Sequence, residues 1–168
     1  MVEAFIAFGS NIGNREANIN NAFDLLKQKM SIVKRSALYE TKPMYVQEQD
    51  WFLNGAAKVE TKLPPRRLLL FLKDIEQKLG RKSVERNGPR IIDLDILFYG
   101  KQIVDENDLH VPHPKIEERA FVLVPLVEIA ADFVHPVNHK TVRELLSQLD
   151  YDKSEIKRKK KQRRIDQK

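Results

Sequence analysis

The sequence "NGPRIIDLDILFYG", residues 87–100, is an apolar run interrupted by two acids. Side chains of an extended chain alternate between two faces at about 3.3 Å per residue. Asp93 and Asp95 would therefore leave one face roughly 6–7 Å apart, and the even positions from Ile92 to Phe98 would form an unbroken apolar face. In a helix the same acids would interrupt the apolar surface on both sides. The pattern predicts a buried strand. Its two carboxylates would destabilise the fold unless a cation neutralises their charge.

Hydrophobic periodicity elsewhere predicts the order strand, helix, strand, strand, helix, strand. The expected strands are residues 2–8, 31–41, 52–62 and 91–99, and the expected helices are 14–30, capped by Asn14, and the helix that Pro64-Pro65 opens and Gly80 ends. This order predicts an α+β protein with a ferredoxin-like β-α-β-β-α-β core, an antiparallel sheet whose helices cover one face, and long mobile loops. Beyond this core we expect a strand at 101–104, a helix near 117–123 stopped by Pro125, and a helix at 141–149.

Composition restricts the class of protein. The 168 residues include no cysteine, which excludes disulfides and thiolate metal sites, and no stretch approaches the length of a membrane span. Of the net charge of +6, residues 153–168 carry +7, with nine Lys or Arg against two acids, so the rest carries −1. We expect one cytoplasmic domain at 1–152 and a basic, disordered tail at 153–168, solubilising rather than nucleic-acid-binding.

Two connections, residues 42–51 and 81–90, are longer than their elements require, as binding loops often are. The second carries Arg81, Lys82, Arg86 and Arg90 directly before the acidic strand. Mg²⁺ prefers carboxylate and phosphate oxygens, and arginine forks bind phosphate, so a metal-phosphate complex would use both sets. Spacing alone leaves open a second interpretation, in which the arginines pair structurally with the aspartates.

The first connection is flanked by Tyr45, Trp51, Phe52 and Asn54. Aromatic faces with one amide suit a flat heterocycle that has hydrogen-bonding edges. The four histidines do not form a helical pair and have no cysteine to assist them, so zinc is not expected.

Six blocks of the sequence resemble a known family over residues 1–135. They are "FGSNIGNR", "YETKP", "FLNGA", "GPRIIDLDILFYG", "VPHP" and "ERAFVLVPL", in the order and spacing of the 6-hydroxymethyl-7,8-dihydropterin pyrophosphokinases. The resemblance implies an enzyme of folate biosynthesis, and we expect a monomer. It would transfer the diphosphate of MgATP to the hydroxymethyl group of the pterin and release AMP, using two Mg²⁺ ions.

The resemblance also implies residue roles. Asp93 and Asp95 would hold the two Mg²⁺ ions, and Arg81, Arg90 and Asp95 would be catalytic. The implied ATP-binding residues are Glu76, Arg81, Arg86, Arg90, Ile96, His113 and Arg119. The implied pterin-binding residues are Thr41, Met44, Phe52, Asn54 and Phe121.

The sequence departs from the family pattern at three places. Asn87 stands where many members carry an aromatic residue, and Phe52 stands where tyrosine is common. The 81–90 connection is one residue shorter than in some relatives, which leaves open whether Lys82 or Arg86 acts as its second phosphate-binding cation. Two other classes share some of these features, a Mg²⁺-dependent nuclease and an RNA-binding ferredoxin-like module. The body's net charge of −1 and the lack of an aromatic and basic pattern on the strands disfavour both.

Overall fold

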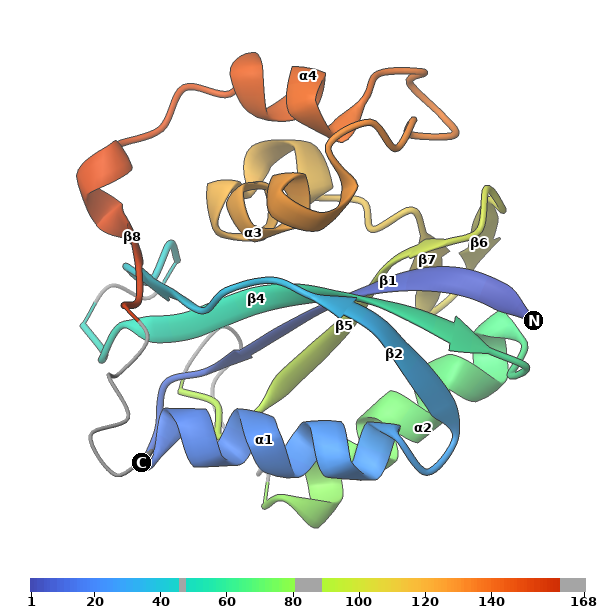
Figure 1. The fold of residues 1–168 in the computed structure, drawn as a ribbon, viewed down its shortest axis with the longest axis horizontal. Helices are drawn as coiled ribbons and strands as arrows, with labels where there is room; N and C mark the ends of the chain where they lie inside the picture. The colour runs from blue at the N-terminus through green and yellow to red at the C-terminus, as the bar shows by residue number, and fades with distance from the viewer. Residues whose placement is uncertain (46–47, 81–88, 161–168) are drawn as a thin grey trace, which may run out of the picture.

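The computed structural model describes residues 1–45, 48–80 and 89–160. Figure 1 shows the arrangement of the elements. In chain order they are β1 (Val2–Ser10), α1 (Arg15–Leu26), β2 (Met30–Arg35), β3 (Tyr39–Thr41), β4 (Phe52–Thr61), α2 (Pro65–Lys78), β5 (Asp93–Tyr99), β6 (Val104–Glu106), β7 (Leu109–Val111), η1 (Ile116–Glu118), α3 (Ala120–Ala130), α4 (Val142–Ser147), η2 (Lys153–Glu155) and β8 (Ile156–Arg158).

The main sheet confirms the predicted ferredoxin-like order. Strand β1 lies between β5 and β4, every pairing is antiparallel, and β4 pairs with β2 along one part of its length and with β3 along another. The single strand expected at 31–41 is thus two strands. They separate at Ser36, whose hydroxyl accepts a hydrogen bond from the backbone N–H of Ala56 at 2.9 Å, while its own N–H donates to the carbonyl of Ala56.

Helices cover both faces of the sheet, which corrects the prediction of one covered face. Helices α1 and α2 lie on one side, and α3 and α4 lie on the other (Figure 1). Leu26 and Leu72 belong to the core on the first side, whereas Leu123 and Leu126 belong to a second core on the opposite side. The additional layer follows from the chain beyond β5, whose apolar residues need a sheet face to pack against.

The acidic strand carries a bulge that the sequence pattern does not reveal. Ile6 pairs with Ile96 and Phe5 pairs with Phe98, so Leu97 is an extra residue on β5. Leu97 and Phe98 consequently both pack in the core beneath α3 and α4, and the predicted unbroken apolar face up to Phe98 is wrong. The two acids precede the bulge and keep their shared face.

Helix α3 continues through Pro125, where the sequence predicted a stop. Proline inside a helix removes one backbone hydrogen bond and costs about 3 kcal/mol or more. Leu123, Leu126 and Ile129 are buried against the sheet, and this burial outweighs that cost.

The chain between β5 and α3 differs from prediction as well. The strand expected at 101–104 is shifted to β6, because Gly100, at φ 52°, and Lys101 form a turn in which Gln102 N–H donates to the Tyr99 carbonyl at 3.0 Å. Among the residues that the structure describes, strand β6 pairs only with β7, in a separate hairpin.

The basic tail is ordered over its first half. Residues 153–160 contain η2 and β8, and β8 pairs antiparallel with β3 (Figure 1). Pairing with a strand explains why a charged segment is fixed, and it corrects the prediction of disorder for this stretch. Residues 161–168 lie outside the described residues. Among the helices of the described ranges, none combines the length and apolarity needed to cross a membrane.

Candidate active site

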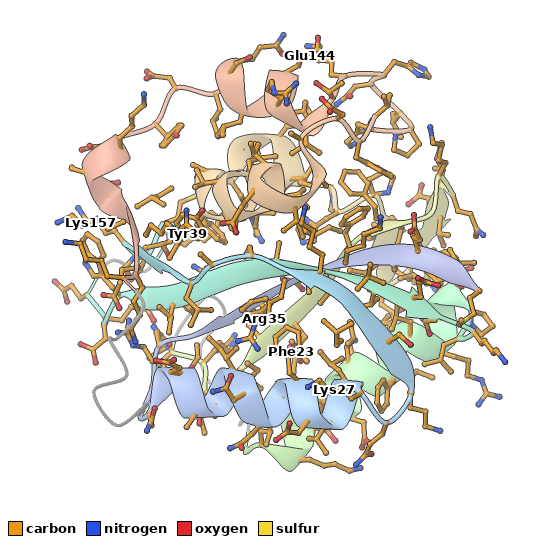
Figure 2. The ribbon with its side chains drawn as sticks, in the orientation of Figure 1. Phe23, Lys27, Arg35, Tyr39, Glu144 and Lys157 are labelled. Atoms are coloured by element: carbon orange, nitrogen blue, oxygen red, sulfur yellow. The ribbon has the colours of Figure 1, made fainter. Side chains whose placement is uncertain are left out.

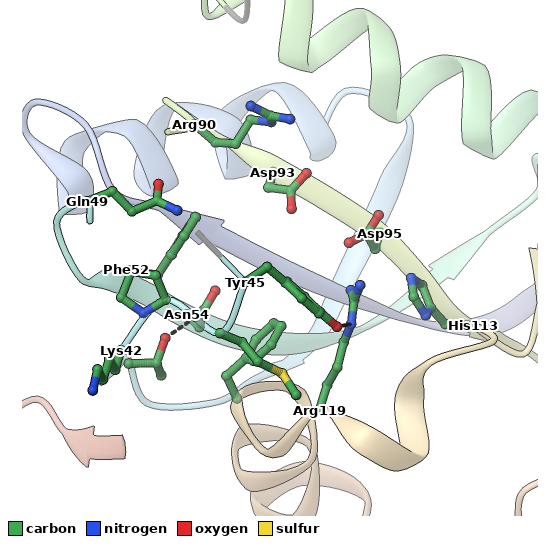
Figure 3. Close-up of a pocket in the computed structure, with 14 residues that line it drawn as sticks. Lys42, Tyr45, Gln49, Phe52, Asn54, Arg90, Asp93, Asp95, His113 and Arg119 are labelled. Carbon is green, nitrogen blue, oxygen red and sulfur yellow. Dashed lines mark hydrogen bonds between the residues drawn. The ribbon is translucent and has the colours of Figure 1, made fainter. Parts of the chain in front are cut away.

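A cavity of about 260 Å³ lies where the acidic strand, the end of β3, the start of β4 and the start of α3 meet (Figure 3). Its lining combines carboxylates, cations, amides and aromatic rings. The lining residues are Thr41, Lys42, Pro43, Met44, Tyr45, Gln49, Phe52, Asn54, Arg90, Asp93, Asp95, His113, Arg119 and Phe121.

One side of the cavity is the charged wall, formed by Arg90, Asp93, Asp95, His113 and Arg119. Figure 3 shows both aspartates leaving the same side of β5 toward the cavity. Both are half-buried, and their partners on β1 are Gly9 and Ala7, whose small size leaves room beside the carboxylates.

Asn11 fixes the chain that leads into β5. Its backbone N–H donates to the carbonyl of Arg90 at 3.0 Å, and its side-chain oxygen accepts from the N–H of Arg90 at 2.7 Å. The side chain of Asn11 also donates to Gln49 at 2.8 Å and to the carbonyl of Asp50 at 3.0 Å. One buried asparagine thereby links Arg90 to the end of the 42–51 connection.

The other side is the aromatic-amide wall, formed by Thr41, Phe52, Asn54 and Phe121. The Asn54 side-chain N–H donates to the Thr41 hydroxyl, so the amide has a defined orientation (Figure 3). Gly9 makes this orientation feasible, because a Cβ atom there would lie 2.2 Å from the Asn54 side-chain oxygen.

Tyr45 joins the two walls. Its hydroxyl accepts a hydrogen bond from Nε of Arg119 at 3.1 Å, as Figure 3 shows. The Arg119 guanidinium lies 5.3 Å from the centre of the Tyr45 ring and 5.6 Å from that of Phe121, and Lys115 Nζ lies 5.5 Å from the Tyr45 ring. These cation-ring contacts hold two positive charges at the edge of the cavity.

His113 is a neutral donor in this site. Its Nδ1 accepts from the backbone N–H of Lys115 at 3.2 Å, which leaves the proton of the neutral ring on Nε2. Burial, followed by the nearby charges of Arg119 and Lys115, lowers the pKa of His113 to about 4. Near neutral pH the ring can therefore donate a hydrogen bond without adding charge.

This pKa predicts a pH-dependent loss of stability. The unfolded chain binds a proton near the ordinary pKa of about 6.5, whereas the folded chain resists it down to about 4. The stabilising effect of neutral His113 is fully present above pH 6.5 and is lost as the pH falls toward 4, by at most about 3 kcal/mol. Chemical denaturation at several pH values measures this slope.

His113→Asn is expected to flatten the slope. It keeps a side-chain oxygen for the Lys115 N–H and removes the titrating group. His135, whose pKa burial also lowers, should supply the smaller remaining slope. An unchanged slope in His113→Asn would assign the effect to other groups.

Most of the predicted site residues meet at this cavity. Arg90, Asp93, Asp95, His113 and Arg119 form its charged wall, and the five implied pterin-binding residues, Thr41, Met44, Phe52, Asn54 and Phe121, also line it. Glu76 and Ile96 instead lie buried in the core behind β5, where the Glu76 carboxylate accepts from the N–H of Leu94 at 2.8 Å. Arg81 and Arg86, like Asn87, lie outside the described residues.

The cavity also contains residues to which the sequence assigned no role. Lys42, Pro43 and Gln49 line it, and Asn11 is hydrogen-bonded to Arg90 beside it. In the sequence, only the place of the first three in the long 42–51 connection could have indicated a role in binding.

The donor set fits Mg²⁺ bound together with phosphate. The described residues contain no group of three or more metal-ligating side chains, so the protein alone offers no closed metal cage there. Asp93 and Asp95 offer hard oxygen ligands on one face, beside cations. Mg²⁺ commonly takes one or two carboxylates and completes its shell with water and substrate phosphates.

Comparison with known proteins agrees with this geometry. "Folic acid synthesis protein FOL1" of Dictyostelium discoideum is 47% identical over 141 residues, which is 84% of this chain and 22% of that protein. The chain thus spans about a fifth of the length of this relative. A "2-amino-4-hydroxy-6-hydroxymethyldihydropteridine pyrophosphokinase" of Methylorubrum extorquens is 46% identical over 153 residues, 89% of this chain and 95% of that protein.

Among solved structures, the Plasmodium falciparum HPPK-DHPS has the same fold, with a TM-score of 0.72 over 87% of this chain and 42% of that chain at 18% identity. Residues 5–131 match the family described as 7,8-dihydro-6-hydroxymethylpterin-pyrophosphokinase (HPPK). Since the match covers most of the chain, and the cavity's aromatic-amide and charged walls lie within it, this chain belongs to the HPPK family.

Proposed function

We propose that this chain transfers a diphosphate group from MgATP to the hydroxymethyl oxygen of 6-hydroxymethyl-7,8-dihydropterin and releases AMP. The observation that carries the proposal is a single cavity with two chemically different walls, in a chain of the HPPK family. An aromatic-amide wall suits a flat heterocycle, and a charged wall suits a metal-bound polyphosphate.

The aromatic-amide wall is proposed to bind the pterin. Phe52 and Phe121 would stack on the two faces of the ring, because aromatic side chains pack well against a flat heterocycle. Asn54 donates to Thr41, so its oxygen remains as an acceptor for the pterin's ring edge. The exposed side chain of Met44 would cover the bound ring.

The charged wall is proposed to bind the triphosphate. Asp93 and Asp95 would hold two Mg²⁺ ions, which, when bound, neutralise phosphate charge and orient the oxygens. Arg90, Arg119 and the neutral Nε2–H of His113 would donate to phosphate oxygens. Arg81 and Arg86 are expected to add cations from the 81–90 connection, and adenine contacts by Ile96 and Glu76 stay predictions of the resemblance.

The reaction requires mainly alignment and charge stabilisation. The pterin hydroxyl oxygen attacks the β-phosphorus, the bond from that phosphorus to the bridging oxygen of AMP breaks, and the hydroxyl proton passes to solvent water. Asp95 lines a small cavity together with Asn54 and Phe121 of the aromatic-amide wall, and it is proposed to orient the hydroxyl. Arg90 is proposed to stabilise the charge that develops on the phosphate oxygens. Exclusion of water by the 42–51 connection would suppress hydrolysis of ATP.

The test is analysis of the nucleotide products. Purified protein is incubated with MgATP, with and without 6-hydroxymethyl-7,8-dihydropterin, and the nucleotides are separated by chromatography. Pterin-dependent AMP without matching ADP is expected. Formation of ADP would mean transfer of a single phosphoryl group and would overturn the proposal. A monomeric state and a cytoplasmic location stay predictions of the sequence.

A further inference from the structure

The C-terminal segment 153–160, here called the strap, is bonded to the strand that ends in Thr41. In β8, Ile156 pairs with Thr41, and Arg158 pairs with Tyr39. Two further backbone hydrogen bonds extend this pairing. The N–H of Lys42 donates to the carbonyl of Glu155 at 2.9 Å, and the N–H of Lys159 donates to the carbonyl of Leu38 at 2.8 Å.

Side chains of the strap contact both ends of the 42–51 connection. Glu155 pairs with Lys42 Nζ at 3.3 Å, at the start of the connection. Lys157, labelled in Figure 2, lies with its Nζ 6.0 Å from the centre of the Trp51 ring, at the end of the connection and next to Phe52. Each contact is weak alone, because exposed ion pairs contribute about 0–1 kcal/mol.

Strand β3 depends on this strap for its outer pairing. It has three residues and, without β8, would be a short edge strand with unpaired backbone groups. Its last residue, Thr41, orients Asn54, and its continuation, Lys42 to Tyr45, lines the cavity.

We propose that the strap positions the aromatic-amide wall, with Glu155 and Lys157 as positioning residues. This inference rests on the proposed function and deepens it. None of residues 153–160 lines the cavity, so the strap acts through Thr41, Lys42 and Trp51. The described contacts of the strap do not include the charged wall. The strap therefore supports binding of the pterin more than binding of MgATP.

The test uses the full chain with single substitutions in the strap. Ile156 has φ −136°, which proline cannot adopt, so Ile156→Pro breaks the pairing with β3 without changing a cavity residue. Ile156→Val is the matched control because valine keeps the strand conformation. Ile156→Pro is expected to raise KM for the pterin about tenfold and KM for MgATP less than about twofold. In this variant the aromatic-amide wall has lost its support, so pterin binding must also order the residues of that wall.

A second pair of variants tests Lys157. Lys157→Gln is expected to raise KM for the pterin about twofold, and Lys157→Arg should restore it, because arginine keeps the cation over the Trp51 ring. Equal changes in both KM values, or an unchanged pterin KM in folded Ile156→Pro, would overturn the inference.

Amide hydrogen exchange keeps this test separate from the test of the activity itself. Exchange in residues 39–54, including the Lys42 N–H, should accelerate in Ile156→Pro and stay unchanged in Ile156→Val. Absence of turnover in the unsubstituted chain would refute the proposed function. Unchanged exchange in Ile156→Pro would refute the strap whether or not the chain turns over.

Discussion

Asp95→Asn is expected to lower kcat by about 10³-fold while the chain remains folded. The substitution keeps the size of the side chain and removes a negative charge that lies on the same face as Asp93. The proposed metal-phosphate complex loses a charged ligand, whereas the fold keeps a side chain of the same size. The loss is therefore expected in turnover and not in folding.

Steady-state kinetics and thermal unfolding together measure this outcome. Asp24→Asn is the matched control, because Asp24 is exposed on α1, away from the cavity, and should keep full activity. A folded Asp95→Asn protein with a near-normal rate would rule out the role proposed for this carboxylate.

Gly9→Ala is expected to raise KM for the pterin by about 10- to 100-fold. The new Cβ atom would lie 2.2 Å from the Asn54 side-chain oxygen, so the amide must turn away. That movement breaks its hydrogen bond to Thr41 and removes the acceptor that is proposed to bind the pterin's edge. A lost hydrogen bond in a buried site costs about 1–3 kcal/mol, which gives this range.

A double-mutant cycle separates this effect from general damage to the sheet. Asn54→Ala alone should raise the pterin KM to a similar extent, and adding Gly9→Ala to it should change little, because the clashing amide is gone. Additive effects of the two substitutions would show that Gly9 does not act through Asn54. Gly55→Ala, which would instead meet the ring of Phe8, provides a structural comparison.

The order of the core elements and the acidic face of β5 could be predicted from the sequence. Both follow from local periodicity, because alternation along an extended chain and the 3.6-residue repeat of a helix depend only on near neighbours. Asn14 capping α1 was likewise predictable, since an N-cap side chain bonds the N–H groups that follow it in the chain, here that of Ala17.

The residues expected at the site were found through motifs, and folding brought ten of them to one cavity. Their individual roles stay proposals. No local rule could have placed Glu76 behind β5, where its carboxylate accepts from the Leu94 N–H, because that contact joins α2 to β5 across the core.

The remaining features depend on contacts between segments that are distant in the sequence. The bulge at Leu97 arises from pairing with β1, and α3 passes Pro125 because the sheet buries the residues around it. Within the basic segment, residues 156–158 form a strand because β3 offers them an open edge. Charge composition predicts only how an isolated segment behaves in water. Strand β3, with which the segment pairs, lies more than a hundred residues earlier in the chain. This pairing stabilises the segment only after folding has brought the two strands together.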